Sequence, residues 1–496
     1  MKTKALILFL AITPLISKSQ ANWNDSTFVH RAGQNMLDGQ NNSIKLEGPM
    51  VQGWVMWEGW MWGASGGFTS ETTIYNAIQF KLGTAQADNF RDSVYQNYIT
   101  RADIKKISEQ CFNVISIPFN HLMLEDDNNP YVYKPRGWEI LDSVLKWCED
   151  YNLYVVLSLH SAPGGQSTLF TADPDLITLW QSSVNRQRTT ELWKAIADRY
   201  KNRGIIAGYD VLNEPDAPSD SALLAMYNDI IDSIRTVDTN HLLFIQGKQF
   251  ASDFSLFTSL PDSNMSFCFH FYTWFIPNSS IPFYLNNYAS LSINMNVPVW
   301  CGEWGQNIYS ILDTTLTCLQ TPSYQIRGEA YCSWKTEWKG TSYPYYCGID
   351  TALYWDKSIT WICNIFAPQP TVAEMQLGIS DFITNMKFQN CIFNDTMNAI
   401  VQLCPNTSIP DLEEANMNVI VFPNPFSTQT TLQTEKNLKD ATLMVYNVYG
   451  QEVNRLINIS GQTIIFSRDN LPSGIYFIRL SQDNKIIATD KLMITD

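Results

Sequence analysis

The sequence has few basic residues for its length, and this scarcity excludes one large class of partner. Lys and Arg total 33 against 48 Asp and Glu, which gives a formal net charge of -15 over 496 residues. A nucleic-acid-binding protein needs a basic face to neutralise phosphates. We therefore expect no nucleic-acid partner.

Metal and nucleotide signatures are also missing. The ten cysteines include no Cys-x-x-Cys pair, and only five histidines occur in the whole chain. Zinc sites built on cysteine usually show such paired spacing. No Gly-x-Gly-x-x-Gly follows an early strand pattern, which argues against a dinucleotide site. We expect no metal and no other cofactor.

Long hydrophobic runs are confined to the N-terminus. Lys2 and Lys4 precede an apolar stretch over residues 5–16, and small and polar residues follow. This is the pattern of a secretory signal peptide, and its apolar part is too short to span a membrane. We predict a signal peptide over residues 1–20 and no transmembrane segment in the mature chain.

Beyond the signal peptide the chain repeats an apolar or β-prone run followed by a polar or aromatic end, eight times in about 300 residues. Between several runs lie segments with helical periodicity, for example residues 138–150. Alternating strands and helices of this number are typical of an α/β fold, the (β/α)8 TIM barrel, which we expect over residues 48–402. The pattern alone leaves an open doubly wound sheet as the alternative. The eight runs are Val51 to Trp57, Asn113 to Asn120, Leu153 to His160, Ile205 to Glu214, His241 to Gly247, Met265 to Tyr272, Val297 to Glu303 and Glu329 to Thr336.

The last part of the chain has a different texture. Residues 403–417 are rich in Pro, Asn, Thr and acids, which indicates a linker. Residues 418–496 alternate apolar and polar positions in short runs separated by turn signals. This pattern predicts a small all-β sandwich domain.

Two glutamates follow predicted strands at their carboxyl ends, where parallel barrels place their catalytic groups. Glu214 follows the apolar run from Ile205 to Leu212, and Pro215 ends that run because proline has no N–H for a ladder. Glu303 follows a second apolar run in the same way. Catalytic groups of such barrels lie at the carboxyl ends of the strands. Glycoside hydrolysis needs two carboxyl groups across one cleft, so this pair predicts that chemistry.

Other strand ends supply candidate substrate-binding side chains. His160 and His270 end the third and sixth runs, and Tyr272 lies two residues later on the same face, where its hydroxyl can reach a carboxylate. Trp334, at the end of the eighth run, is our candidate for the floor on which a sugar ring stacks. The aromatic residues in and after the first run are candidates for outer sugar subsites, and three further carboxylates near strand ends are held in reserve. The former are Trp54, Trp57, Trp60 and Trp62, and the latter are Glu58, Glu125 and Glu337.

These motifs together resemble glycoside hydrolase family 5, the cellulase-type (β/α)8 barrels. Within that family, the chain resembles the exo-glucanase-like branch more than the classical endoglucanases. The resemblance covers residues 48–390 and implies a retaining hydrolase of a β-glucan such as cellulose, β-1,3-glucan or mixed-linkage glucan. It implies that Glu214 is the acid/base, Glu303 the nucleophile and Asn213 the ligand of the sugar 2-hydroxyl. His160, His270, Tyr272 and Trp334 would shape the central subsite. The motifs are Leu212-Asn-Glu-Pro215, Gly302-Glu-Trp304, Leu159-His160, His270-Phe-Tyr272 and Trp334.

One position departs from the family pattern. The family usually has Arg on its second strand, near the nucleophile, where this chain has Ser116 in Ser116-Ile117-Pro118. A nearby cation would lower the pKa of Glu303. Without the arginine, either another cation replaces it, Lys335 being one candidate, or the pH optimum changes, or activity is poor. The departure keeps an alternative open, a surface barrel that binds glycan without cleaving it. A β-mannanase with the same mechanism is the other alternative.

The C-terminal residues resemble the sorting domain of type IX secretion substrates. The resemblance implies that the secretion machinery is a partner and that the protein is secreted or held on the outer-membrane surface. A carbohydrate-binding sandwich is the alternative. The carriers are Val421-Phe-Pro-Asn-Pro-Phe426, Val445-Tyr-Asn-Val-Tyr-Gly450, Leu471-Pro-Ser-Gly-Ile-Tyr476 and Lys491-Leu-Met-Ile494.

Overall fold

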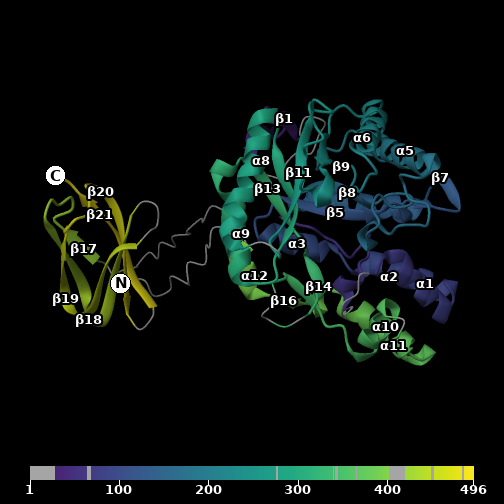
Figure 1. Cartoon of the computed structure of the whole chain (residues 1–496). Helices are drawn as coiled ribbons and strands as arrows, with labels where there is room; N and C mark the ends of the chain where they lie inside the picture. The colour runs from purple at the N-terminus through teal and green to yellow at the C-terminus, as the bar shows by residue number, and fades with distance from the viewer. Residues whose placement is uncertain are drawn as a thin grey trace, which may run out of the picture. The chain divides into compact units, whose positions relative to one another are not determined.

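The structure is a computed structural model of the whole chain (Figure 1), and its contacts divide it into two units, Met1–Cys404 and Pro405–Asp496. It describes residues 28–63, 69–274, 277–338, 340, 344–364, 366–401, 419–447, 452–482 and 485–496. The predicted signal peptide over residues 1–20 and the predicted linker over residues 403–417 lie outside the described residues. Within these ranges, no helix has both the length and the apolar character needed to cross a membrane.

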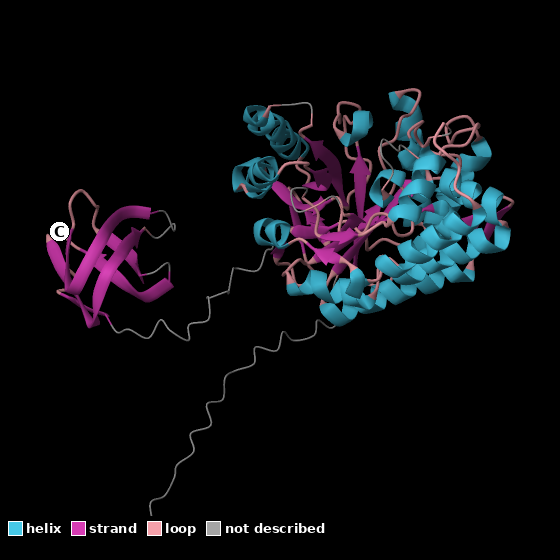
Figure 2. Cartoon of the chain, turned by 90° about the horizontal axis from the view of Figure 1, so that it is seen from below, coloured by secondary structure: helices cyan, strands magenta, loops and turns pink. Residues whose placement is uncertain are grey.

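The first unit is built on eight parallel strands, which Figure 2 shows in magenta inside a layer of helices. The strands are hydrogen-bonded in the order β4-β13-β12-β11-β10-β9-β8-β5. Val51 N–H donates to the carbonyl of Ser116 over 2.9 Å, and Asn113 N–H to that of Glu47 over 3.1 Å, so the two edge strands close the ring. The predicted (β/α)8 barrel is confirmed. The strands are β4 (Leu46–Pro49), β5 (Val114–Asn120), β8 (Tyr154–Ser161), β9 (Ile206–Asp210), β10 (Leu242–Gln246), β11 (Met265–Tyr272), β12 (Val299–Gly305) and β13 (Ile326–Tyr331).

The first and last strands differ from the predicted runs. The first barrel strand is Leu46–Pro49, and the apolar segment after it passes over the barrel mouth, touching β5 through a bridge between Val55 and Phe119. The last strand ends at Tyr331 rather than at Thr336. The chain then forms β14 (Lys335–Glu337), which pairs with β15 (Cys347–Ile349) and, through it, β16 (Ile392–Phe393) in a separate sheet.

Helices with one apolar stripe cover the barrel. α4 begins at Pro135, since proline is favoured at the first helical position, and ends at Tyr151; Asn152, with a φ of 57°, gives a left-handed cap. Helices α1, α2, α10 and α11 contact one another beside the barrel (Figure 1). The helices are α1 (Glu71–Leu82), α2 (Thr84–Asn97), α3 (Arg101–Glu109), α4 (Pro135–Tyr151), α5 (Ser183–Tyr200), α6 (Asp220–Arg235), α7 (Lys248–Ala251), α8 (Ile281–Met295), α9 (Tyr309–Gln320), α10 (Leu353–Cys363), α11 (Val372–Asn385) and α12 (Asp395–Val401). Short strands complete the unit: β1 (His30–Ala32), β2 (Asn35–Leu37), β3 (Ser43–Ile44), β6 (Glu125–Asp126) and β7 (Asn129–Tyr133).

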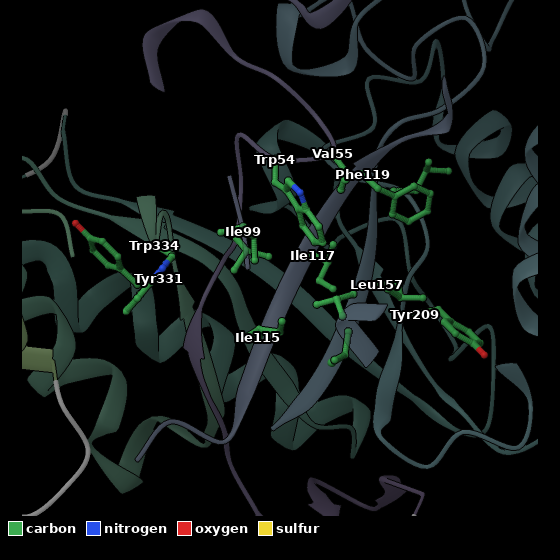
Figure 3. Packing of buried hydrophobic residues seen from close by; sticks show 14 of the residues in the cluster. Trp54, Val55, Ile99, Ile115, Ile117, Phe119, Leu157, Tyr209, Tyr331 and Trp334 are labelled. Carbon is green, nitrogen blue, oxygen red and sulfur yellow. The ribbon is translucent and has the colours of Figure 1, made fainter. Parts of the chain in front are cut away.

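Side-chain alternation along the strands separates two layers of core. On β5, Ile115, Ile117 and Phe119 belong to the cluster that packs between strands and helices (Figure 3), whereas Val114 belongs to the cluster inside the barrel. The floor of the barrel is apolar and includes Trp300. Polar interior side chains lie closer to the carboxyl ends of the strands, so the two ends of the barrel differ in chemistry. These polar residues include Ser158, Asp210, Gln246 and His270.

The second unit is an antiparallel β domain, as predicted. Its strands are β17 (Val419–Phe422), β18 (Gln429–Tyr446), β19 (Glu452–Ser467), β20 (Gly474–Gln482) and β21 (Lys485–Ile494). The long strand β18 pairs with β19 from Gln429 to Tyr446, with β17 in its first half and with β20 in its second half. Buried apolar side chains such as Leu432, Leu443 and Leu480 form a core of its own.

Candidate active site

Local backbone irregularities turn the two glutamates toward the barrel mouth. Between β11 and β12 the pairing shifts so that His270 lies opposite Glu303. Gly302 is the extra residue at this irregularity, and an added Cβ there would meet Cys268 Sγ at 2.2 Å, so glycine is required. Glu214 has a φ of 42°, in the left-handed region that a glutamate rarely adopts. Strain of this kind persists only where surrounding contacts hold it.

The structure brings both glutamates to one histidine. His270 Nδ1 lies 2.7 Å from Glu214 Oε1 and 3.9 Å from Glu303 Oε2. The Tyr272 hydroxyl donates to Glu303 Oε1 over 2.5 Å. One atom from each of Glu214, His270 and Glu303 lies within 4.8 Å of the other two. Carboxyl groups this close can share one substrate, one as nucleophile and the other as proton donor.

The environment gives the members of this cluster different charges. Burial alone lowers the pKa of His270, but attraction to Glu303 and the bond to Glu214 outweigh it and raise the pKa to about 9. Burial raises the pKa of Glu303, attraction to His270 opposes this, and repulsion from Glu214 adds to it, so the pKa lies above its ordinary value. Burial, and then the charge of His270, hold the pKa of His160 well below its usual range. At neutral pH the site therefore contains one cationic histidine and one neutral histidine.

A third carboxyl group faces the pair, which the sequence reasoning held only in reserve. Glu58, in the loop after β4, is fully buried and accepts hydrogen bonds from the Gln52 amide and the Trp60 indole. Burial raises its pKa to about 8; the Trp60 bond opposes this, and repulsion from Glu303 adds to it. Glu58 is therefore largely protonated at neutral pH and can donate a hydrogen bond.

The other two carboxylates near strand ends, Glu125 and Glu337, have different surroundings. Glu125 has no exposed surface and forms an ion pair of 3.0 Å with Arg188. Glu337 belongs to β14, outside the barrel sheet. Glu58 interacts electrostatically with both glutamates of the pair.

The prediction that Trp334 forms a stacking floor is wrong. Trp334 has no exposed surface, and its indole N–H donates to Asp103 over 3.0 Å. Its ring packs on Tyr346, and it belongs to the strand–helix core of Figure 3. The outer-subsite prediction fails likewise for Trp54, Trp57 and Trp62, which are fully buried.

An exposed aromatic ring at the site was missed. Trp274 is 54% exposed, and its ring centroid lies 4.4 Å from that of Tyr272, the residue that binds Glu303. The signal for it in the sequence was its place two residues after Tyr272, at the end of the sixth strand. Trp274 offers the free apolar face that the sequence reasoning assigned to Trp334.

The cation beside Glu303 is also a different residue from the one expected. Lys335 has no exposed surface and pairs with Asp103 over 2.9 Å, with a further bond of 3.1 Å to the Met386 carbonyl. His270 instead supplies the positive charge next to both glutamates. Among the described residues, Glu214, His270 and Glu303 form the group of three whose atoms could also ligate a metal ion. Tyr272 and His270 already hydrogen-bond these carboxylates, which suits acid–base chemistry.

Asn213 and His160 lie where strand ends place them. Asn213 is buried, and its Oδ1 accepts from the Gln246 amide over 3.2 Å, which leaves the NH2 end of its side chain to donate to a ligand. His160 is buried within the electrostatic reach of His270. Both therefore belong to the same end of the barrel as the glutamate pair.

Comparison with known proteins gives two family matches. Residues 75–335 match the model described as cellulase (glycosyl hydrolase family 5), and residues 420–495 match the secretion system C-terminal sorting domain. The chain is 34% identical over 252 residues to a beta-xylosidase of Phanerodontia chrysosporium, which covers 50% of this chain and 52% of the relative. It is 29% identical over 206 residues to endoglucanase C of Acetivibrio thermocellus, covering 40% and 59%. The chain thus spans about half the length of the curated relatives it matches.

Solved structures align with the chain at lower identity and with TM-scores below 0.5. The rutinosidase from Aspergillus niger aligns with a TM-score of 0.48 at 18% identity, covering 59% of this chain and 90% of that one. The catalytic domain of Thermobifida fusca endoglucanase Cel5A aligns with a TM-score of 0.43 at 16% identity, covering 71% and 96%.

Proposed function

The chain belongs to glycosyl hydrolase family 5, and on this premise we propose that it is an exported retaining glycoside hydrolase acting on β-glucosidic bonds of a β-glucan. The sorting domain indicates export to the cell surface or the medium. Glu214 serves as acid/base and Glu303 as nucleophile. The relatives named endoglucanase and beta-xylosidase support a β-glycoside as the substrate class.

The separation of the two carboxyl groups is the observation that carries this proposal. An oxygen of Glu214 and one of Glu303 lie within 4.8 Å of each other. Retaining glycosidases place their carboxyl groups about 5–5.5 Å apart, whereas inverting ones leave about 6.5–9.5 Å for a water molecule. The spacing supports direct attack by a carboxylate and double displacement.

The reaction divides between the two glutamates. Ionised Glu303 attacks the anomeric carbon while Glu214 gives its proton to the departing glycosidic oxygen. A glycosyl ester forms on Glu303, and the C–O bond to the leaving group breaks. Glu214 then takes a proton from water, whose oxygen attacks the anomeric carbon and releases Glu303. Asn213 donates to the 2-hydroxyl of the reacting sugar, and the charge of His270 keeps Glu303 ionised.

A substrate panel tests the function and its rivals together. Cello-oligosaccharides, β-1,3- and mixed-linkage glucans, β-mannan and aryl β-xylosides would be incubated with the full-length protein, and proton NMR would follow the anomer released first. We expect β-anomers from a glucan. Cleavage of mannan alone would favour the mannanase alternative. Oligosaccharide binding by calorimetry with no release of reducing ends would favour the non-catalytic barrel.

The acidic limb of activity should lie above the ordinary range of a glutamate. Because burial and Glu214 raise the pKa of Glu303, the nucleophile becomes protonated, and activity falls, at a pH above 4.5. The hydrogen bond from Tyr272 lowers that pKa, so Tyr272→Phe should shift the acidic limb of kcat/KM to higher pH and reduce the maximum about 10-fold. The measurement is kcat/KM against pH for both proteins. An unshifted limb would show that Tyr272 does not act on the ionisation of Glu303.

Trp274 should contribute to binding of the sugar chain. Trp274→Ala removes an exposed ring beside Tyr272, and a lost aromatic contact of about 1 kcal/mol corresponds to a KM roughly 5-fold higher for oligosaccharides. Trp274→Phe should retain most of the affinity. Phe80, on α1 and 77% exposed, provides the matched control, since Phe80→Ala should leave KM unchanged. Equal KM values for wild type and Trp274→Ala would remove Trp274 from the substrate path.

A further inference from the structure

A buried pair of polar side chains below the site has no part in the mechanism above. Gln246 ends β10 with no exposed surface, and Asp210 ends β9 with 3% exposure. Gln246 Nε2 donates to Asp210 Oδ2 over 2.8 Å, and the Ser158 hydroxyl donates to the same oxygen over 2.7 Å. A buried carboxylate costs free energy unless it is well bonded, so this one demands an explanation.

The carboxamide of Gln246 touches both residues of the acid/base turn. Its Oε1 accepts from the backbone N–H of Glu214 over 2.8 Å, and its Nε2 lies 3.2 Å from Asn213 Oδ1. Glu214 is the residue with the left-handed φ of 42°. A left-handed glutamate preceding a proline is disfavoured on steric grounds, and a buried hydrogen bond to its N–H offsets part of that cost.

Asp210 determines which way the carboxamide points. A carboxylate only accepts hydrogen bonds, so it requires the NH2 end of Gln246 to face it, and this leaves Oε1 for the Glu214 N–H. In the part of the chain that the structure describes, Asp210 Oδ1 has no hydrogen-bond partner. The pair is thus oriented at both ends, and it links the barrel interior to the backbone of the acid/base.

We propose that Asp210 and Gln246 form a positioning relay that holds the side chains of Glu214 and Asn213 in their working geometry. This inference rests on the proposed function. Neither residue touches the reacting atoms: Gln246 acts through the turn, and Asp210 acts through Gln246. The relay should therefore matter most for the step that needs a proton from Glu214.

Leaving-group dependence separates this role from a merely structural one. The leaving group of a 2,4-dinitrophenyl β-glucoside, 2,4-dinitrophenolate, departs without protonation. The phenol leaving group of a phenyl β-glucoside needs a proton from the general acid. We expect Gln246→Leu to lower kcat/KM for the phenyl glucoside about 100-fold, the range of general acid catalysis, and that for the dinitrophenyl glucoside less than about 5-fold. An equal loss on both substrates would overturn the proposal. Tyr227→Phe is the matched control, because the Tyr227 hydroxyl bonds the backbone carbonyl of Gln246 over 2.8 Å and leaves the carboxamide alone.

A polarity swap supplies the rescue. Gln246→Glu places two carboxylates against each other, so the single variant should behave like Gln246→Leu. In the double variant Gln246→Glu/Asp210→Asn, a donor again faces an acceptor, and the new carboxylate accepts from the Glu214 N–H. The double variant should recover about 10-fold in kcat/KM for the phenyl glucoside over Gln246→Glu. No recovery would count against the relay.

Hydrogen exchange tests the relay independently of activity. The peptide containing Glu214 should exchange its amide hydrogens at least about 10-fold faster in Gln246→Leu than in wild type or Tyr227→Phe, because the N–H loses its acceptor. Unchanged exchange would refute the relay even if the enzyme were inactive on both aryl glucosides. Inactivity of the wild type with faster exchange in the variant would instead refute the proposed function and leave the relay standing.

Discussion

Glu303→Ala should lower kcat/KM on the preferred β-glucan by about 10⁴-fold or more, the largest catalytic effect we expect from a single substitution. The variant lacks the group that we propose to form the glycosyl ester, and no charge remains at that position to stabilise an oxocarbenium-like transition state. A loss of 10⁴-fold corresponds to about 5.5 kcal/mol of transition-state stabilisation. Steady-state hydrolysis of the full-length protein, with thermal unfolding measured in parallel, checks the effect at constant fold.

Azide distinguishes a lost nucleophile from general damage. In Glu303→Ala, azide can enter the vacated space and attack the anomeric carbon directly, so an activated aryl β-glucoside should yield the α-glucosyl azide. In Glu214→Ala the ester on Glu303 still forms, and azide should release the β-glucosyl azide. If both variants kept wild-type rates, or if the two anomers appeared the other way round, the assignment of roles would be wrong.

Glu329→Gln provides the matched control for these variants. Glu329 is a buried glutamate on the neighbouring strand β13, bonded to the Trp304 indole, and burial raises its pKa to about 8. It is therefore already largely neutral at pH 7, and the amide keeps an acceptor for Trp304. We expect activity within about 3-fold of wild type, so a large loss would show that any buried glutamate of this barrel end is sensitive.

Strand ends could be predicted from the sequence because they depend on short, local patterns. An apolar run that stops at proline or at a glycine–carboxylate pair marks the carboxyl end of a buried strand, and this identified Glu214 and Glu303. His270 and Tyr272 followed from alternation along one continuous strand, β11. The structure brings these four side chains together because neighbouring parallel strands end at the same rim.

Alternation failed where the strand itself ended. Had β13 continued past Tyr331, the side chains of Ala330, Cys332 and Trp334 would all face the barrel interior. The strand stops at Tyr331; Ala330 and Cys332 pack against the interior cluster, and Trp334 joins the strand–helix core. Trp334 N–H donates to the Met50 carbonyl, a long-range contact with no local signal in the sequence.

The charged groups beside Glu303 also could not be predicted from local sequence patterns. Ser116 leaves Glu303, the proposed nucleophile, without the arginine usual in the family, and Lys335, next to the end of the eighth run, was one candidate to replace it. Which cation stands beside a carboxylate depends on strand register, and the pairing of β11 with β12 gives that place to His270. Glu58 was equally hidden, because it reaches the site from a loop whose path over the barrel mouth follows no strand periodicity.

Lys335→Met should destabilise the barrel by about 3–5 kcal/mol, the largest stability effect we expect. Lys335 and Asp103 are both fully buried and 2.9 Å apart. Asp103 also accepts from the Trp334 indole and from the backbone N–H of Thr100 at the start of α3. Without Lys335 the buried carboxylate of Asp103 loses its cation. The uncompensated negative charge of Asp103 then lies where a strand, a helix and the core meet. Denaturant unfolding of the full chain measures the loss, and Lys105→Met is the control, since its exposed pair with Glu109 is worth at most about 0.5 kcal/mol.

The activity of the same variant decides what Lys335 is for. If it serves only the fold, Lys335→Met assayed well below its unfolding temperature should keep kcat/KM and the acidic limb of the pH profile within error of wild type. If it were the cation that ionises Glu303, the acidic limb would move to higher pH whatever the stability. Asp103→Leu combined with Lys335→Met removes both charges, and recovery of part of the lost stability would identify the unpaired carboxylate as the cause. In the part of the chain that the structure describes, Lys335 is paired with Asp103, and His270 is the cation that lies beside Glu303, the proposed nucleophile.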